Sequence, residues 1–239
     1  VSFLLQATLP YAATHLTPPD DAASGPRPAA ARPQLLASIR EAWHWLRAHP
    51  ALALFLTCSL LPFIVLMVSN YLFPVYVSQT LHAGAAYFGY GEIVFALGAM
   101  SAGALLPRLL ARTQAHAAIL GCALTFTVGL AAITFLHHPW VYLAASLCLG
   151  FGNAGTRVAR GTLMLHVVPN GVMGRIGVFY NVLDRLLRTA LVGAMAVIDW
   201  WGPPAGFAVL LALLLAALGG IYATRTAVQT STRAAPAPA

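Results

Sequence analysis

The hydrophobic and polar positions of this chain fall into long, separate blocks. After residue 50, six mainly apolar runs follow one another, divided by short polar connections. The runs cover residues 51–77, 86–106, 117–136, 140–168, 174–200 and 204–223. Because a helix needs about 20 such residues to cross the hydrocarbon of a bilayer, the pattern predicts six transmembrane helices.

Strands do not fit these runs. A transmembrane β-barrel requires alternating polarity in segments of about 10 residues, and the runs are apolar on all sides. Backbone groups in lipid must also be satisfied within the segment, which favours helices. The expected fold class is therefore all-α, an integral membrane bundle of six helices over residues 51–224.

The residues before the bundle have a different character. Residues 10–33 are rich in Pro and Ala, which is typical of a flexible linker, and residues 34–49 carry apolar side chains at helical spacing. We expect residues 10–50 to form a cytoplasmic linker that contains an amphipathic helix at the membrane surface. The tail of residues 225–239 is polar and rich in Pro and Ala, and we expect it to be disordered and cytoplasmic.

Residues 1–9 form a short apolar stretch without a basic region before it or a small-residue cleavage site after it, so they do not resemble a signal peptide. We expect them to be the end of a preceding transmembrane helix. The chain would then be a fragment, although processing could produce the same start.

Composition supports membrane insertion. The chain is 59% hydrophobic and 8% charged, whereas soluble domains carry roughly 25% charged residues. The formal net charge is +7, but the arginines are dispersed and form no aromatic-basic patch, so no nucleic acid is expected as a partner. The expected partner is the lipid bilayer.

Arginine is distributed unevenly over the connections, alternating from one to the next. By the positive-inside rule, the arginine-bearing connections face the cytoplasm, which places both ends of the chain inside. We expect a multi-pass protein of the bacterial inner membrane. The cytoplasmic arginines are Arg27, Arg32, Arg40, Arg47, Arg108, Arg112, Arg175, Arg225 and Arg233, and the connections expected outside carry His82, His137, His138 and Asp199.

Catalytic chemistry has no recognisable motif here. The chain contains no HExxH, GxSxG or phosphate-binding glycine-rich loop, so we predict neither an enzyme nor ATP-driven transport by this chain. The three cysteines lie inside apolar runs, and their spacing matches no zinc or redox motif. No cofactor and no metal are expected.

The charged residues inside the predicted spans are the main candidates for function. Charges in a bilayer are costly and usually face a partner or a wet cavity. Glu92 lies in the second span, Arg157 and Arg160 in the fourth, and Asp184 and Arg188 in the fifth, where the i, i+4 spacing lets them pair. Glu92 would need a partner from another helix. The excess of arginine could attract an anionic substrate, but the arginines could also snorkel or join helices.

Uncharged polar and small residues add further candidates. Asn70, Asn153 and Asn181 could contact a substrate or simply bond across helices. Small residues at helical spacing let helix backbones approach closely, which serves either a gate or plain packing, and plain packing is the simpler interpretation. These small residues are Gly98, Ala99, Ala102, Gly103, Gly150, Gly152, Ala154 and Gly155.

Three stretches resemble the second half of a major facilitator superfamily transporter, on the branch of the enterobactin exporter and related drug-efflux proteins. They are EAWHWLRAHPALALFLTCSLL, YFGYGEIVFALGAMSAGALLPRLL and VVPNGVMGRIGVFYNVLDRLL, which are similar to the run into the seventh helix, the eighth helix and the turn between the tenth and eleventh helices. The loop GALLPRLLARTQAH keeps Gly103, Arg108 and Arg112 but lacks the acidic residue that the family often has there.

The resemblance implies the C-terminal half of a twelve-helix fold, with a missing N-terminal six-helix half as partner and a substrate cavity between the halves. It implies a secondary active transporter that works by alternating access. We expect proton-coupled efflux of a small amphipathic molecule, such as a siderophore or a drug, in which Glu92 or Asp184 changes protonation. A membrane scaffold or receptor that does not transport is the alternative, and a membrane-embedded enzyme is a weaker one.

Overall fold

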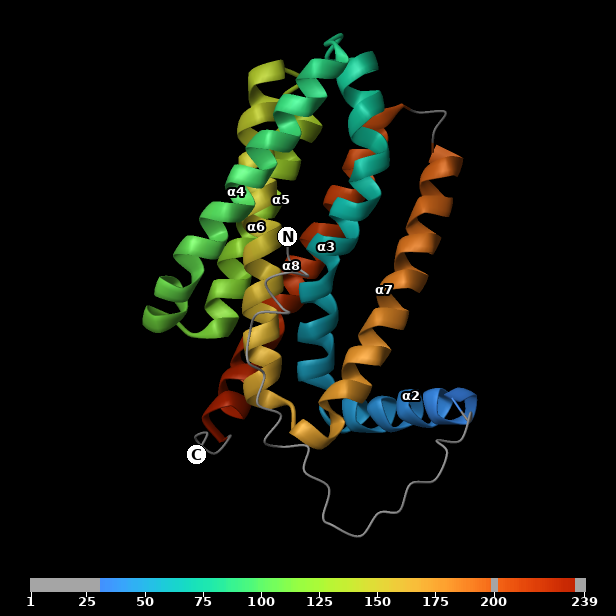
Figure 1. Cartoon of the computed structure of the whole chain (residues 1–239), viewed down its shortest axis with the longest axis vertical. Helices are drawn as coiled ribbons and strands as arrows, with labels where there is room; N and C mark the ends of the chain where they lie inside the picture. The colour runs from blue at the N-terminus through green and yellow to red at the C-terminus, as the bar shows by residue number, and fades with distance from the viewer. Residues whose placement is uncertain (1–30, 199–201, 235–239) are drawn as a thin grey trace, which may run out of the picture. The chain divides into compact units, whose positions relative to one another are not determined.

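The computed structural model describes residues 31–198 and 202–234, which form helices and short connections (Figure 1). No strand occurs within these ranges, so the all-α prediction is confirmed for them. The elements are α2 (Ala31–Ala48), α3 (Pro50–Val75), the π-helix η1 (Tyr76–Thr80), α4 (Ala85–Arg112), α5 (Ala115–Phe135), α6 (Pro139–Val167), α7 (Asn170–Ile198) and α8 (Pro203–Ala234).

Four segments in the described part of the chain are long and apolar enough to cross a membrane. They are Pro50–Thr80, Ala85–Arg112, Ala115–Phe135 and Pro203–Thr230. Helices α6 and α7 have 29 residues each, which gives about 44 Å of length at ~1.5 Å per residue. They are less apolar because α6 carries two arginines and several glycines, and α7 carries Asp184, Arg185 and Arg188. Their crossing of the membrane, and hence the six-helix bundle, stays a prediction.

The prediction of a disordered tail from residue 225 is wrong as far as Ala234. Helix α8 continues to that residue, and Val228 is fully buried. The extension is rich in Thr, Ala and Arg and contains no Pro or Gly that would end a helix. Tail residues 235–239 lie outside the described residues. The same holds for the predicted helix remnant at residues 1–9, for the linker as far as residue 30, and for Asp199.

Helices α3 to α8 run alternately in opposite directions (Figure 1). The start of α3, the α4–α5 connection, the α6–α7 connection and the end of α8 therefore lie at one end of this bundle. These are the connections predicted to be cytoplasmic from their arginines. The arrangement agrees with the predicted alternation, and the side of the membrane that each end faces stays a prediction.

Helix α2 packs against the bundle. Ala42 and Leu46 are buried in a cluster with residues of α3, and Glu41 forms an ion pair with Arg175 of α7. The exposed Trp43 lies under the Arg47 guanidinium, whose carbon is 4.8 Å from the ring centroid. The predicted amphipathic helix is thus present, with its apolar face partly covered by the bundle.

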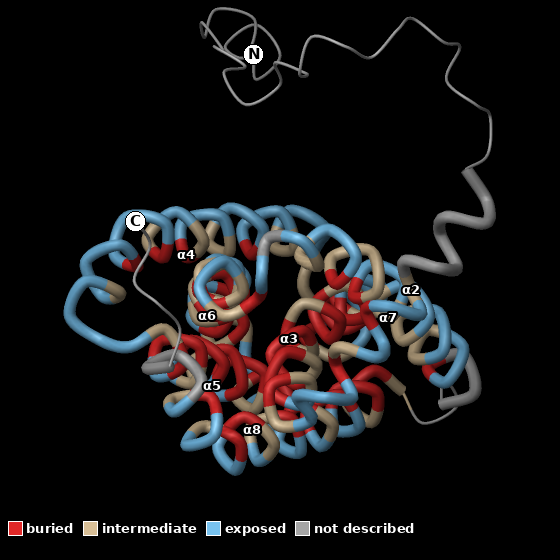
Figure 2. The backbone as a smooth tube through the Cα atoms, turned by 90° about the horizontal axis from the view of Figure 1, so that it is seen from below, coloured by how far each residue is buried: buried red, intermediate tan, exposed pale blue. Residues whose placement is uncertain are grey.

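Helices α4 and α6 approach each other backbone to backbone. A Cβ added to Gly98 would overlap the Leu147 carbonyl oxygen, and one added to Gly150 would overlap the Phe95 carbonyl oxygen. Gly103, in contrast, has nothing within 4 Å of such an atom. The predicted close packing by small residues is confirmed for Gly98 and Gly150. The outer side of α4 remains exposed along much of its length (Figure 2).

Helix α7 packs against α3 through larger apolar side chains and not through glycines. Its apolar stripe includes Ile176, Tyr180 and Leu183 and packs into the cluster that α3 supplies. The Tyr180 hydroxyl donates a hydrogen bond to the Ala53 carbonyl at 3.2 Å. Helix α3 lies between α7 and α6 in both views (Figures 1 and 2). The polar side of α7 is therefore not used for packing against α6.

Candidate functional site

Two predicted residues, Asn70 and Glu92, line one pocket between α3, α4 and α6. The pocket has a volume of about 90 Å³. This volume holds water molecules but not a drug-sized ligand, for which pockets measure roughly 300–1,000 Å³. The other residues around it are Leu66, Met67, Phe73, Gly91, Phe95, Tyr142, Ser146 and Leu149. We call this the Glu92 pocket.

Tyr142 also lines the Glu92 pocket and was not among the predicted site residues. Its ring is buried, and it lies so close to Gly91 that a Cβ there would overlap the ring. Phe73 supports the ring from α3, with centroids 6.1 Å apart. A signal for it existed in the sequence, because Tyr142, Ser146 and Asn153 lie on one face of a helix, at spacings of four and seven residues.

Glu92 itself is exposed, near the start of α4. It makes no ion pair with any residue in the described ranges, so the partner expected from another helix is not found there. Nearby polar groups are Asn70, which is also exposed, and Ser146, whose hydroxyl already donates to the Tyr142 carbonyl at 2.8 Å. Glu92 is therefore the one of the two predicted acids that is not held by an ion pair among the described residues.

A second group of predicted residues meets around Phe63, near the middle of α3. The Arg157 guanidinium carbon from α6 lies 4.8 Å from the centre of the Phe63 ring. The Arg188 guanidinium carbon from α7 lies 5.4 Å from the same centre. Such distances allow cation–π attraction. Phe63 was not predicted as a site residue, because an aromatic residue in an apolar run looks like core.

Asp184 and Arg188 form the predicted i, i+4 pair. Arg188 Nη2 donates to Asp184 Oδ2 at 2.6 Å, and the Asp184 side chain is 13% exposed. Arg160 from α6 is half-buried and close enough to Asp184 to interact with it electrostatically, and its buried Nη1 atom has no hydrogen-bond partner within the described residues. We call Phe63, Arg157, Arg160, Asp184 and Arg188 the arginine cluster.

The two predicted asparagines that remain have different environments. Asn153 is buried on α6, between Ser146 and Arg157, and its Oδ1 atom has no partner in the described ranges. Asn181 is exposed on α7, three residues before Asp184 and so on the same side of the helix. The Glu92 pocket and the arginine cluster contact α6 at different heights. Ser146 lines the pocket and Arg157 belongs to the cluster, and their positions on the helix are about 16 Å apart at ~1.5 Å per residue.

Residues 1–190 match the protein family described as Major Facilitator Superfamily. The chain belongs to this superfamily. The resemblance seen in the sequence is therefore confirmed at the level of the superfamily, whose members are membrane transporters rather than enzymes. A comparison with curated proteins and one with solved structures found no match.

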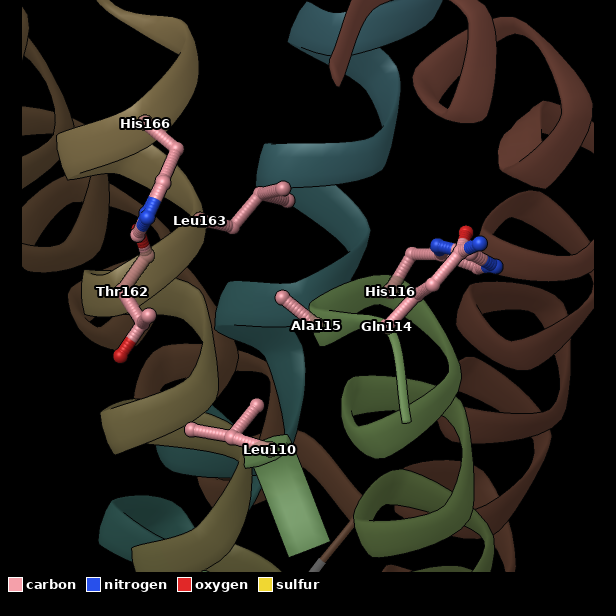
Figure 3. Close-up of a pocket in the computed structure, with 7 residues that line it drawn as sticks. All are labelled: Leu110, Gln114, Ala115, His116, Thr162, Leu163 and His166. Carbon is pink, nitrogen blue, oxygen red and sulfur yellow. The ribbon is translucent and has the colours of Figure 1, made fainter. Parts of the chain in front are cut away.

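A larger pocket of this superfamily member lies at the end of α4, where α5 and α6 meet it. It has a volume of about 280 Å³, and His116 and His166 lie on opposite sides of it (Figure 3). Both rings already have partners: His166 Nδ1 lies 2.8 Å from the Thr162 carbonyl oxygen, and His116 Nε2 lies 2.7 Å from Gln229 Nε2. The His116 ring joins α5 to α8 and the His166 ring bonds within α6, so the Glu92 pocket and the arginine cluster are better candidates for transport.

Proposed function

We propose that this chain is part of a secondary active transporter that exchanges protons for a small amphipathic molecule and exports it, as a siderophore or drug exporter does. The observation that carries the proposal is the Glu92 pocket. An acid without an ion-pair partner among the described residues shares a small, largely apolar pocket with the polar groups of Asn70, Tyr142 and Ser146. A carboxyl group in such a place can bind a proton when the pocket is closed and release it when water enters.

Glu92 is the better proton carrier of the two predicted acids. Protonation of Asp184 would break its 2.6 Å ion pair with Arg188, whereas protonation of Glu92 breaks none among the described residues. Losing one side of a partly buried pair leaves the other charge without compensation. We therefore assign proton exchange to Glu92 and a different task to Asp184.

We further propose that a second six-helix unit faces α3, α4, α6 and α7, and that the two units rock about a site between them. The exposure of Asn70, Glu92 and Asn181 supports this, because polar side chains at these depths would otherwise meet lipid. In this proposal residues 51–224 form the six-helix bundle of one half, in a bacterial inner membrane with both ends in the cytoplasm.

The proposal is tested with proteoliposomes that carry an imposed pH gradient. The probes are radiolabelled 2-naphthalenesulfonate, the uncharged 2-naphthalenesulfonamide and a quaternary naphthylammonium ion, which differ in charge but share an apolar ring system. We expect accumulation of at least one probe above its equilibrium level when protons can move in the opposite direction. Glu92→Gln should abolish this accumulation, because an amide cannot carry a proton at neutral pH.

The control variant is Glu41→Gln. Glu41 is an exposed acid on α2, outside the predicted spans, and its loss should leave accumulation within about twofold of the wild type. Gradient-driven accumulation that survives Glu92→Gln, or its absence for all three probes in the wild-type protein, would show that the proposal is wrong.

A further inference from the structure

The arginine cluster, in which Arg157 is exposed and Arg160 and Arg188 are half-buried, has an excess of positive charge beside the middle of α3. Arg157 and Arg188 lie over Phe63, Arg160 lies close enough to Arg157 and Asp184 to interact with them electrostatically, and Asp184 contacts Arg188. One carboxylate cannot neutralise three guanidinium groups, and guanidinium stays charged at any physiological pH. Charges of one sign at this depth are costly unless an opposite charge joins them.

The hydrogen-bonding groups of the cluster are also incomplete. Arg160 Nη1 and Arg188 Nε are buried donors without a partner in the described part of the chain. Buried donors of this kind carry a free-energy penalty that an acceptor would remove. An oxyanion is the acceptor that suits guanidinium geometry best, because planar guanidinium groups bind carboxylate, sulfonate or phosphate oxygens through paired hydrogen bonds.

Two acceptors accompany these donors. Asp184 Oδ1 and Asn153 Oδ1 are buried without a hydrogen-bond partner among the described residues. They call for a hydroxyl or amide hydrogen beside the anionic group. The Phe63 ring between the arginines supplies an apolar surface at the same place. The chemistry that fits all three features is an organic anion with an aromatic or otherwise apolar body.

We propose that the arginine cluster binds the anionic group of an amphipathic organic anion, and that this anion is the transported molecule. The inference rests on the proposed transport function, whose substrate it narrows from any amphipathic molecule to an anion. Arg157 and Arg188 hold the oxyanion from two helices, and Phe63 contacts its apolar body. Asp184 weakens this binding, because it occupies Arg188 when no anion is present.

The test measures equilibrium binding of radiolabelled 2-naphthalenesulfonate to the full chain in lipid nanodiscs, at neutral pH and without any gradient. We expect saturable binding that 2-naphthalenesulfonamide does not displace at equal concentration, because the two differ in charge but hardly in shape. Arg157→Gln and Arg188→Gln should each raise the Kd roughly tenfold or more.

Two further variants separate binding from folding. Arg185→Gln removes a neighbouring exposed arginine on another side of α7, and its Kd should stay within about twofold of the wild type. Asp184→Asn should lower the Kd roughly threefold or more. The substitution frees Arg188 from its ion pair and removes the negative charge that opposes an anion in the cluster. A cluster that merely joins helices predicts the opposite for Asp184→Asn, namely a loss of both stability and binding.

Equal binding of the sulfonamide, or no binding of the sulfonate to the wild-type chain, would overturn the inference. An unchanged Kd in the double variant Arg157→Gln and Arg188→Gln would also overturn it. That result is expected if these arginines pair with acids of another protein unit and not with the anion. These outcomes are independent of Glu92, since no proton gradient is present. A failure here would leave proton-coupled transport standing, and a failure of the Glu92→Gln test would leave anion binding standing.

Discussion

Helix α6 has two very different neighbours. Toward α4 it offers glycines, and the backbones come so close that a Cβ on Gly98 or Gly150 would overlap a carbonyl oxygen. On the side of α3 it carries Arg157, which lies over Phe63, and Arg160, whose Nη1 atom has no hydrogen-bond partner among the described residues. The α4–α6 interface has no space for a larger side chain at these glycines. The arginine side of α6 instead keeps polar atoms that have no hydrogen-bond partner among the described residues. Helix α6 therefore takes part both in the close α4–α6 packing and in the arginine cluster.

The largest effect should come from filling the glycine contact. Gly98→Ala places a methyl group against the Leu147 carbonyl oxygen, and backbone cannot move aside cheaply, so we expect a loss of about 3 kcal/mol of unfolding free energy. Gly103→Ala on the same helix meets nothing within 4 Å and should be neutral or stabilising by up to about 1 kcal/mol. Unfolding of both variants in a denaturing-detergent titration measures the difference. Equal midpoints would mean that α4 and α6 are not in backbone contact.

A smaller effect is expected where α7 is tied to α3. Tyr180→Phe removes the hydrogen bond from the Tyr180 hydroxyl to the Ala53 carbonyl. The Thr57 hydroxyl also donates to that carbonyl at 2.8 Å, so the oxygen keeps a partner and the loss should be about 1 kcal/mol. Hydrogen exchange of the α7 backbone amides should become faster, with little change in α5. Unchanged exchange in α7 would argue that this bond does not hold the helix.

The smallest effect should follow from the ion pair between α2 and α7. The Arg175 and Glu41 side chains are 45% and 51% exposed, so water and salt screen their attraction. We expect Glu41→Gln to cost about 0.5 kcal/mol or less, and the difference to vanish at high salt. The same detergent titration, run at two ionic strengths, checks this. A loss as large as that of Gly98→Ala would show that α2 contributes much more to holding α7 than its exposure implies.

Much of the fold follows from local rules that act along the chain. Uninterrupted apolar runs of about 20 residues predict helices, and the starts of α3 to α6 agree with the predicted runs to within two residues, while α4 continues six residues past the end of its run. The polar composition of residues 225–234 predicts disorder, yet α8 continues to Ala234, because Ala and Arg are good helix formers and no Pro or Gly interrupts residues 224–234.

The site was predictable only where its geometry is local. The Asp184–Arg188 pair follows from i, i+4 spacing on one helix. The meeting of Asn70 with Glu92, and of Arg157 with Arg188, joins different helices, and no spacing in the sequence encodes such contacts. Phe63 was missed because an aromatic residue in an apolar run looks like core, and Tyr142 was missed although it shares a helix face with Ser146 and Asn153.

We propose that proton exchange belongs to Glu92 and substrate binding to the arginine cluster, two sites that helix α6 connects. The most direct measurement is the number of protons moved per molecule of 2-naphthalenesulfonate transported, read from a pH-sensitive dye inside proteoliposomes at saturating probe. We predict that Glu92→Gln moves the probe only down its own gradient, with essentially no accompanying protons. Arg157→Gln should need more probe but keep the wild-type ratio. An unchanged proton ratio in Glu92→Gln, or a lost ratio in Arg157→Gln, would contradict the account.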